Sequence, residues 1–322
     1  MESKSFRLSR RSALAAGVGA VLSAAAGRVL AQAAAASGRV PADETHWARM
    51  GVSLDGKVAL VTGSTDGLGR EVARQLGALG AFVIVHGRNA ERGEEVVRLV
   101  RGTGAGDAVF YRADFGSLAE VEAFAARVLE EHDRLDLLIN NAAAAGLRER
   151  RESADGYELS FAVNYLSHFL LTHRLLPLLR ASAPARVVNV SSMGQAPLDF
   201  DDLMFERNYD SGDAYRRSKL AQIMFTIDLA ATLDPSEVTV TAVHPARSMN
   251  TARVIGGGFE PLSTVEEGAE AVMQLAVSPE VAGVTGVYFN QLNQARANEQ
   301  AYDADARRRL WDISLELTGL DS

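Results

Sequence analysis

Short apolar segments separated by helical patterns constrain the fold of this chain more than any other feature. From residue 57 onward, runs of mainly β-branched or bulky residues lie at positions 58–61, 82–85, 108–111, 135–139, 187–190, 238–243 and 287–289. Continuous rather than alternating apolarity is typical of strands that are covered on both faces. Between the runs, apolar residues recur at helical spacing, as at Val121, Phe124 and Val128. This alternation predicts an α/β fold with a doubly wound parallel sheet and helices on both faces.

The composition is that of a globular protein. Of the 322 residues, 47% are apolar and 23% are charged, which argues against a disordered chain and against a polytopic membrane protein. No internal repeat and no second composition regime divides the sequence, so we predict one domain over residues 55–322. Residues 34–54 contain a Ser-Gly pair, Pro41 and mixed charges, and we expect them to form a linker or arm.

Charge and residue usage exclude several classes of function. The formal net charge is −8, so a nucleic-acid backbone would be repelled. The chain has no cysteine, which excludes disulfides, thiolate zinc sites and cysteine nucleophiles. His168 and His173 are five residues apart, about 140° around a helix, and do not share a face that could bind a metal. We interpret both as packing or surface histidines and expect no metal.

The first 33 residues resemble an export signal of the twin-arginine type. Arg10 and Arg11 precede fifteen weakly apolar residues, 13–27, and a small-residue site at 31–33. Fifteen residues are too few to span a bilayer comfortably. We therefore expect an exported, periplasmic protein without stable membrane insertion after processing. The alternatives are an amphipathic or disordered tail and a cytoplasmic location.

Two predicted helical stretches, 161–179 and 220–233, are apolar nearly all round. Such helices must be buried on more than one side. Either they pack in the interior, or their faces meet a second subunit in a homodimer or homotetramer.

A glycine-rich turn follows the first predicted strand and opens a helix. Its glycines permit a tight turn and a close approach of the backbone to a pyrophosphate, which the helix N-terminus favours. The alternative is a strand-to-helix turn that binds no ligand. The predicted cofactor-binding residues of this turn, after Thr62, are Gly63, Ser64, Thr65, Asp66, Gly67, Leu68 and Gly69.

The ends of the next strands indicate which dinucleotide binds. The second run ends without a carboxylate that would bind the adenosine ribose, whereas Arg88 could face a 2′-phosphate, so NADP(H) is favoured over NAD(H). Arg88 could instead be a solvated arginine. Asp114 could accept a hydrogen bond from the adenine amino group or could cap a helix. Asn141, Ala142 and the small residues after them close the fourth run. They leave room for a cofactor across the strand ends, and we expect Asn141 and Ala142 to bind it.

Tyr215 and Lys219 are four residues apart on a predicted helix, about 150 residues after the glycine turn. That spacing places them on one face. A free phenol with a pKa of about 10 is a sluggish acid or base at pH 7. A nearby ammonium group and the positive end of a helix would both lower that pKa. Ser192, at the end of the fifth run, could hold a substrate oxygen near the phenol. A plain helix surface is the alternative for any isolated Tyr-x-x-x-Lys.

In this order and spacing, the motifs resemble those of the short-chain dehydrogenase/reductase family over about residues 55–292. The resemblance implies a Rossmann-type domain, an NAD(P) cofactor and the interconversion of alcohols and carbonyls. It places the catalytic tetrad on Asn164, Ser192, Tyr215 and Lys219. In the family, tyrosine passes the proton, lysine also binds the nicotinamide ribose, serine positions the carbonyl and asparagine holds a relay water.

The resemblance also has finer features. It maps the interfacial helices of the family onto the two apolar stretches, and residues 201–220 resemble the retinol-dehydrogenase and protochlorophyllide-reductase branch. Where the family usually has Pro-Gly after the sixth strand, this chain has Pro245-Ala246. We expect this difference to alter the contacts of Pro245 and its neighbour with the nicotinamide. Residues 247–263 lie where the family keeps a mobile substrate lid, although a disordered insertion is the alternative.

The sequence therefore predicts an NADP-dependent oxidoreductase that transfers hydride between nicotinamide and a carbonyl or a primary or secondary alcohol, with Tyr215 as the acid/base. A non-catalytic NAD(P)-binding regulator is one alternative, and a sugar-nucleotide epimerase or dehydratase is another. The spacing of the glycine turn argues against the second alternative.

Overall fold

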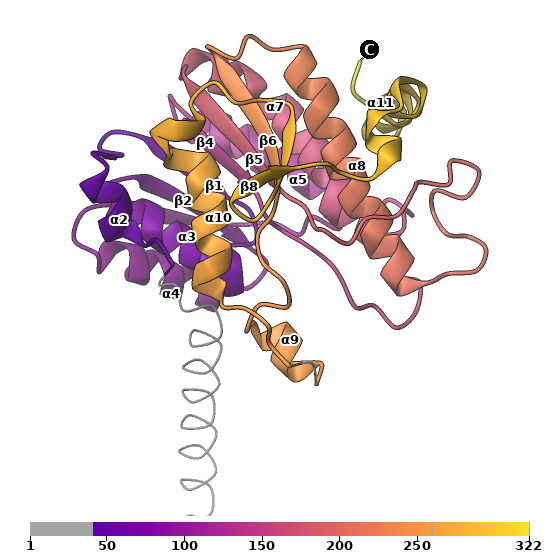
Figure 1. The fold of residues 1–322 in the computed structure, drawn as a ribbon, viewed down its shortest axis with the longest axis horizontal. Helices are drawn as coiled ribbons and strands as arrows, with labels where there is room; N and C mark the ends of the chain where they lie inside the picture. Colours follow the sequence, from indigo (N-terminus) through magenta and orange to yellow (C-terminus); the bar gives the residue numbers. More distant parts are fainter. Residues whose placement is uncertain (1–40, 259, 322) are drawn as a thin grey trace, which may run out of the picture. The chain divides into compact units, whose positions relative to one another are not determined.

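A computed structural model describes residues 41–258 and 260–321. Within these residues, one sheet runs in the order β3-β2-β1-β4-β5-β6-β7-β8 (Figure 1). Every neighbouring pair is parallel except β7 and β8, which are antiparallel. The strands are β1 (Val58–Val61), β2 (Phe82–Gly87), β3 (Asp107–Arg112), β4 (Leu137–Asn140), β5 (Ala185–Val190), β6 (Val238–His244), β7 (Val287–Asn290) and β8 (Asn293–Ala295).

Helices cover both faces of the sheet, so the predicted doubly wound α/β fold is confirmed (Figure 1). One layer contains α3 (Gly67–Ala78), α4 (Ala90–Arg101) and α10 (Val265–Val277). The other layer contains α5 (Leu118–Glu131), α7 (Ser167–Ala181) and α8 (Ser211–Ala231). The remaining helical segments are α2 (Glu44–Arg49), α6 (Leu159–Phe161), the π-helix η1 (Ala162–Leu166), α9 (Ala252–Gly256), the 3-10 turns η2 (Pro279–Val281) and η3 (Glu299–Tyr302), and α11 (Ala304–Thr318).

Residues 41–54, which the sequence predicts as part of a linker or arm, contain α2. The carboxylate of Asp43 caps this helix by accepting from the amides of Thr45 and His46. Trp47 is 4% exposed, and Arg74 of α3 forms a salt bridge of 2.8 Å with Glu44. This part of the arm therefore packs against the domain.

Residues 247–264 form a separate compact unit from residues 41–246 and 265–321. The unit contains α9, and a β-bridge between Met249 and Ser263 joins its two ends. The amide of Leu262 also donates to the carbonyl oxygen of Ser248 at 3.0 Å. The segment expected to be a lid or a disordered insertion thus folds back on itself.

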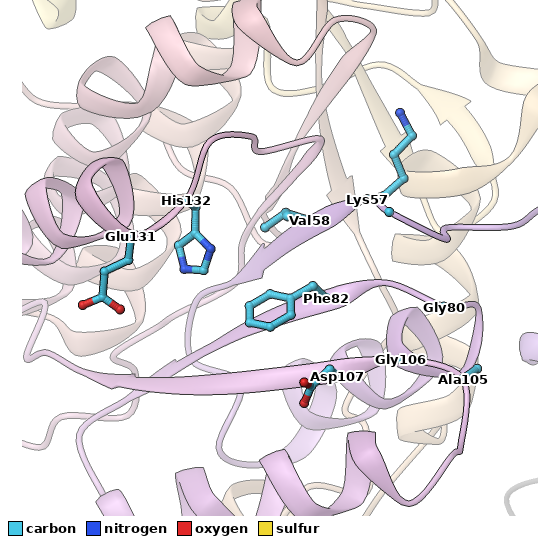
Figure 2. A pocket seen from close by; sticks show the side chains of 10 residues that line it. Lys57, Val58, Gly80, Phe82, Ala105, Gly106, Asp107, Glu131 and His132 are labelled. Carbon is cyan, nitrogen blue, oxygen red and sulfur yellow. The ribbon is translucent and has the colours of Figure 1, made fainter.

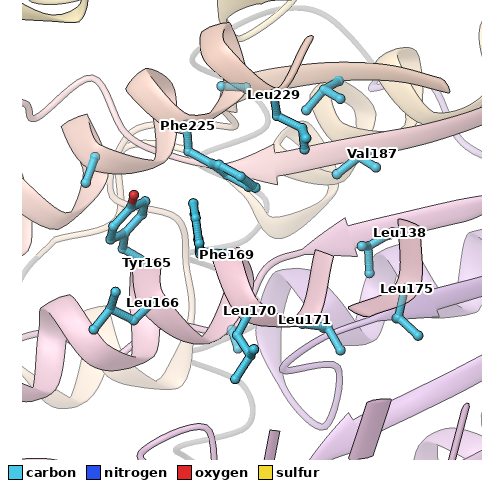
Figure 3. Close-up of a cluster of buried hydrophobic side chains, with 14 of the residues drawn as sticks. Leu138, Tyr165, Leu166, Phe169, Leu170, Leu171, Leu175, Val187, Phe225 and Leu229 are labelled. Carbon is cyan, nitrogen blue, oxygen red and sulfur yellow. The ribbon is translucent and has the colours of Figure 1, made fainter. Parts of the chain in front are cut away.

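The two apolar helical stretches pack within this single chain. Phe169 of α7 and Phe225 of α8 are buried and their ring centroids are 5.1 Å apart (Figure 3). Trp311 of α11 packs edge-on against Phe169 at 5.3 Å, and Ser314 of the same helix bonds the hydroxyl of buried Tyr165 at 2.7 Å. Interior packing therefore accounts for the apolarity of these stretches, and no second subunit is needed to explain it.

His86, at the end of β2, connects the glycine turn to β3. Its Nδ1 accepts from the amide of Gly63 at 3.0 Å, so the ring proton lies on Nε2, which donates to the carbonyl oxygen of Ala113 at 3.2 Å. Burial lowers the pKa of His86 to about 3. Protonation at Nδ1 would place its N–H opposite the N–H of Gly63, so the hydrogen bond from Gly63 would be lost.

Burial also lowers the pKa of His168 to about 3 and that of His244 to about 4. An unfolded histidine titrates near 6.5, so below pH 6.5 the unfolded state binds protons that the folded state does not. The stability from these three histidines is complete above pH 6.5 and falls as the pH drops toward 4. We expect a loss of roughly 4 kcal/mol between pH 7.5 and 5.5, at about 1.4 kcal/mol for each histidine per pH unit. Urea unfolding at both pH values measures it, and equal stabilities would contradict the prediction.

Trp311→Ala should lower the free energy of unfolding by about 2 kcal/mol, because it removes a half-buried ring from the α7–α8–α11 cluster. Urea unfolding of the variant measures this loss. Arg308→Ala is the matched control on the exposed side of the same helix, and its effect should stay within about 0.5 kcal/mol. Equal effects of the two changes would show that α11 does not stabilise the helix pair.

Candidate active site

The predicted site residues gather where the parallel strands end. The turns after β1, β4, β5 and β6 all leave the same edge of the sheet, because these strands are parallel. This is the edge at which open α/β sheets bind ligands. The predicted residues Gly63, Asn141, Ser192 and Pro245 follow these four strands.

The glycine turn lies close against the end of β4. Gly63 has φ +63°, and a Cβ there would lie 2.7 Å from Cα of Ala142. A Cβ at Gly69 would lie 2.5 Å from the carbonyl oxygen of Gly63 and from Nδ2 of Asn141. Only glycine therefore fits at either position.

Thr62 joins the same two segments through its hydroxyl oxygen. This oxygen accepts from the amide of Asn141 at 2.8 Å and from that of Ala142 at 2.9 Å. The side chain of Asn141 donates to the carbonyl oxygens of Thr62 and Gly63. The predicted cofactor residues Asn141 and Ala142 thus fix the shape of the glycine turn.

The start of α3 carries the other residues of the turn. Asp66 caps the helix by accepting from the amide of Gly67 at 2.8 Å, and it forms a salt bridge of 3.1 Å with Arg92. The hydroxyl of buried Ser64 donates to the carbonyl oxygen of Val61 and is used inside the turn. Leu68 and Gly69 are buried in the first turn of this twelve-residue helix, whose positive end favours an anion.

Arg88 and Asp114 lie together beyond β2 and β3. Their charged groups are 3.9 Å apart, with 75% of the arginine side chain and 40% of the aspartate side chain exposed. Asp114 accepts from the amide of Gly116, whereas Ser117 caps α5, so Asp114 is not the helix cap that the sequence left open. Thr65 of the glycine turn is adjacent, since a Cβ on Gly87 would lie 2.5 Å from its methyl group.

Lys219 is a buried cation that ties α8 to β5. It is 2% exposed, and its Nζ donates to the carbonyl oxygen of Val190 at 2.8 Å. The same Nζ lies 5.7 Å from the ring centroid of Tyr215, which is partly buried. The structure therefore brings the predicted phenol and ammonium group together beside the end of β5.

Ser192 lies two residues beyond β5 and is 8% exposed. Its Oγ accepts from the amide of Gly194 at 3.0 Å. Its carbonyl oxygen accepts from Gln195 Nε2 at 2.9 Å and from the hydroxyl of Tyr288 at 3.2 Å. These bonds fix the backbone that presents the serine.

Asn164 lies in η1, where a π-helical turn connects α6 to α7. Such turns are rare and occur frequently at functional sites. The buried side chain binds both backbone groups of Ala144, and its Nδ2 donates to Ser218 Oγ at 2.9 Å. Ser218 in turn donates to the carbonyl oxygen of Tyr215, so Asn164 is linked to the Tyr215 backbone through one hydroxyl.

Pro245 and Ala246 are buried directly after β6. The preceding His244 is 6% exposed, and its Nε2 has no hydrogen-bond partner within the described structure.

A surface cavity of about 600 Å³ lies at the opposite edge of the sheet (Figure 2). Lys57, Phe82 and Asp107 at the amino ends of the first three strands line it, together with Glu131 and His132. Lys57 pairs with Asp136, and Asp107 pairs with Arg101. This cavity contains none of the residues that the sequence predicts for the site.

Three further buried residues hold the site together: His86, His168 and Gln222. The sequence indicated His168 only as a packing or surface histidine and did not indicate the other two. His86 binds the amide of Gly63, and Gln222 binds Lys219. The spacing of Gln222, three residues after Lys219 on one helix, is a signal that could have identified it. The contacts of His86 with Gly63 and of His168 with Thr62 join segments distant in sequence and carry no local signal.

The residues present fit a dinucleotide. The glycine turn approaches β4 as closely as backbone allows, and the start of α3 offers a positive helix end. The arginine beyond β2 is largely exposed and so is accessible to a phosphate.

The comparisons with known proteins agree with this geometry. The family described as short chain dehydrogenase matches residues 57–254. Retinol dehydrogenase 14 of Homo sapiens is 39% identical over 295 residues, covering 83% of this chain and 88% of that protein. Retinol dehydrogenase 13 of Homo sapiens is 38% identical over 288 residues, covering 84% of this chain and 87% of that protein.

Solved structures show the same fold. A putative uncharacterized protein from Mycobacterium Paratuberculosis superposes with a TM-score of 0.71 at 28% identity, covering 87% of this chain and 98% of that chain. The Pseudomonas aeruginosa RhlG/NADP active-site complex has a TM-score of 0.61 at 29% identity, covering 74% of this chain and 96% of that chain. That complex contains NADP.

The expectation of a protein exported to the periplasm is wrong. The relatives that match 83–84% of this chain are retinol dehydrogenases of Homo sapiens and Mus musculus, and mammalian cells have no periplasm. The predicted leader, residues 1–33, lies outside the described residues. Over residues 41–258 and 260–321, no helix combines the length and the apolarity required to cross a membrane.

The order of the motifs, the sheet topology, the family match and the relatives agree. This chain belongs to the short-chain dehydrogenase family and is an oxidoreductase of that family.

Proposed function

We propose that this protein is an NADP-dependent dehydrogenase/reductase that interconverts an alcohol and its carbonyl compound, with Tyr215 as the acid/base. The observation that carries the proposal is the Lys219 ammonium group, which is 2% exposed and 5.7 Å from the Tyr215 ring. A buried charge is costly, and such groups concentrate at functional sites.

Three residues of the tetrad have roles that their surroundings support. The positive charge of Lys219 and the start of α8, four residues before Tyr215, both favour the phenolate form of Tyr215. In the oxidative direction, Tyr215 Oη takes the hydroxyl proton of the alcohol, and in the reductive direction it returns that proton. Ser192 Oγ, held by the amide of Gly194, donates to the substrate oxygen. Bound NADP(H) supplies the hydride acceptor or donor.

The apolar character of the proposed substrate rests on the relatives and on one side chain. The relatives are named retinol dehydrogenases, and retinol is an apolar primary alcohol. Met193, directly after Ser192, is 52% exposed, so it offers an apolar surface beside the reacting group. We infer that large apolar primary alcohols and their aldehydes are the substrate class.

A homodimer or homotetramer remains a proposal that rests on the resemblance to the family. The apolarity of α7 and α8 no longer supports it, because α11 covers part of these helices within the chain.

Tyr215→Phe should lower kcat/KM for reduction of retinal by NADPH by about 1000-fold, because it removes the proton donor. The dissociation constant for NADPH, measured by nicotinamide fluorescence, should change less than about threefold, which is under 1 kcal/mol. Tyr111→Phe removes a phenol on β3, where the hydroxyl bonds Glu131 and His132, and should leave kcat/KM unchanged. Substantial turnover by the Tyr215 variant would refute the role of Tyr215 as the acid/base. If the wild type bound NADPH but turned over no alcohol or aldehyde, the protein would instead be a non-catalytic NAD(P)-binding regulator.

Arg88→Ala should weaken NADPH binding about tenfold, since one charge-assisted contact to the 2′-phosphate is lost. Binding of NADH, which lacks that phosphate, should stay the same. Arg98→Ala, on the exposed face of α4, is the control for a general loss of positive charge. A wild-type protein that binds NADH as tightly as NADPH would contradict the preference.

A further inference from the structure

Gln222 is a buried amide in direct contact with Lys219. It lies three residues after Lys219 on α8 and is 1% exposed. Nζ of Lys219 lies 2.8 Å from its Oε1. An ammonium group only donates hydrogen bonds, so the atom facing it must be the carbonyl oxygen. This contact fixes the orientation of the Gln222 amide.

The other end of Gln222 faces His168 of α7, with Nε2 3.3 Å from the ring Nδ1. The two ring nitrogens of His168 also contact other segments. Nε2 lies 3.1 Å from the hydroxyl oxygen of Thr62, which accepts from two backbone amides and donates to the carbonyl oxygen of Ile139. Nδ1 lies 3.0 Å from the carbonyl oxygen of Asn164.

His168 is a buried, neutral side chain in contact with Gln222. It is held at one nitrogen by the glycine turn and at the other by the π-helical turn. Burial first and the charge of Lys219 second lower its pKa to about 3. The ring is therefore a neutral group beside the amide nitrogen of Gln222.

We propose that Gln222 is a positioning residue that holds the Lys219 ammonium group against the carbonyl oxygen of Val190, and thereby sets the charge that acts on Tyr215. The proposal rests on the proposed roles of Tyr215 and Lys219. The titratable groups Tyr215, from its own helix, and His168, from α7, lie near Lys219. From β5 it meets the neutral carbonyl oxygen of Val190.

The chain permits a direct measurement, because its only lysines are Lys4, Lys57 and Lys219. Labelling with 13C- and 15N-lysine gives three side-chain signals, which Lys4→Arg and Lys57→Arg assign. Gln222→Met removes the acceptor and should lower the pKa of Lys219 by about one unit. Gln222→Glu keeps an acceptor but adds a negative charge, so it should raise that pKa by about the same amount.

The two variants should affect Tyr215 in the same direction. An ammonium group that is less firmly held, and one whose charge is offset by a carboxylate, both stabilise the phenolate less. The limb of the pH profile of kcat/KM that reports Tyr215 should therefore move up by about one pH unit in each variant. Gln75→Met is the matched control, since Gln75 is also buried in a helix but bonds Glu71. It should leave both the Lys219 signal and the pH profile unchanged.

One measurement needs no variant. In the wild type, the Nζ protons of Lys219 should give nuclear Overhauser contacts to the side chain of Gln222. Missing contacts, or an unchanged Lys219 titration in both Gln222 variants, would overturn the proposal. A shifted titration in a protein that turns over no alcohol or aldehyde would support the positioning role and refute the proposed enzymatic function.

Discussion

The hydrogen bond from Lys219 to the carbonyl oxygen of Val190 is the interaction on which the candidate site depends. It joins α8, which carries Tyr215, to the end of β5, which leads into Ser192. An ammonium group at 2% exposure must be solvated by protein atoms, so it requires acceptors at fixed positions. The backbone of β5 and the amide of Gln222 provide them. The position of the phenol relative to the serine therefore follows from the burial of one cation.

A buried polar layer extends from this lysine to the glycine turn. Thr62 accepts from two amides after β4 and contacts Nε2 of His168, which bonds the π-helical turn at Asn164. Buried polar networks stabilise a structure only when their members are satisfied, and this one links three of the four tetrad residues to the cofactor turn. His86 performs a similar role on the other side of that turn, between Gly63 and Ala113. Both histidines act as neutral hydrogen-bonding groups, and burial keeps them neutral.

The two edges of the sheet differ in chemistry. The carboxyl edge gathers glycines, a buried lysine and side chains whose bonds fix backbone turns. The cavity at the amino edge is lined by charges that pair with neighbouring arginines and aspartates. Paired surface charges contribute little to stability, and none of the predicted site residues lines this cavity. The α11 helix completes the fold by covering apolar rings of α7 and α8 within the same chain.

The sequence by itself determined the sheet, the glycine turn and the pairing of Tyr215 with Lys219, because periodicity and i,i+4 spacing are local properties. It left open whether 161–179 and 220–233 pack inside one subunit, and it placed Asp114 as a possible cap where Ser117 takes that role. Only tertiary contacts show which groups bind Lys219 and which segments His168 joins. Those contacts join Thr62, His168 and Gln222, which come together only when the end of β1 packs with α7 and α8. Local sequence patterns do not predict such long-range contacts.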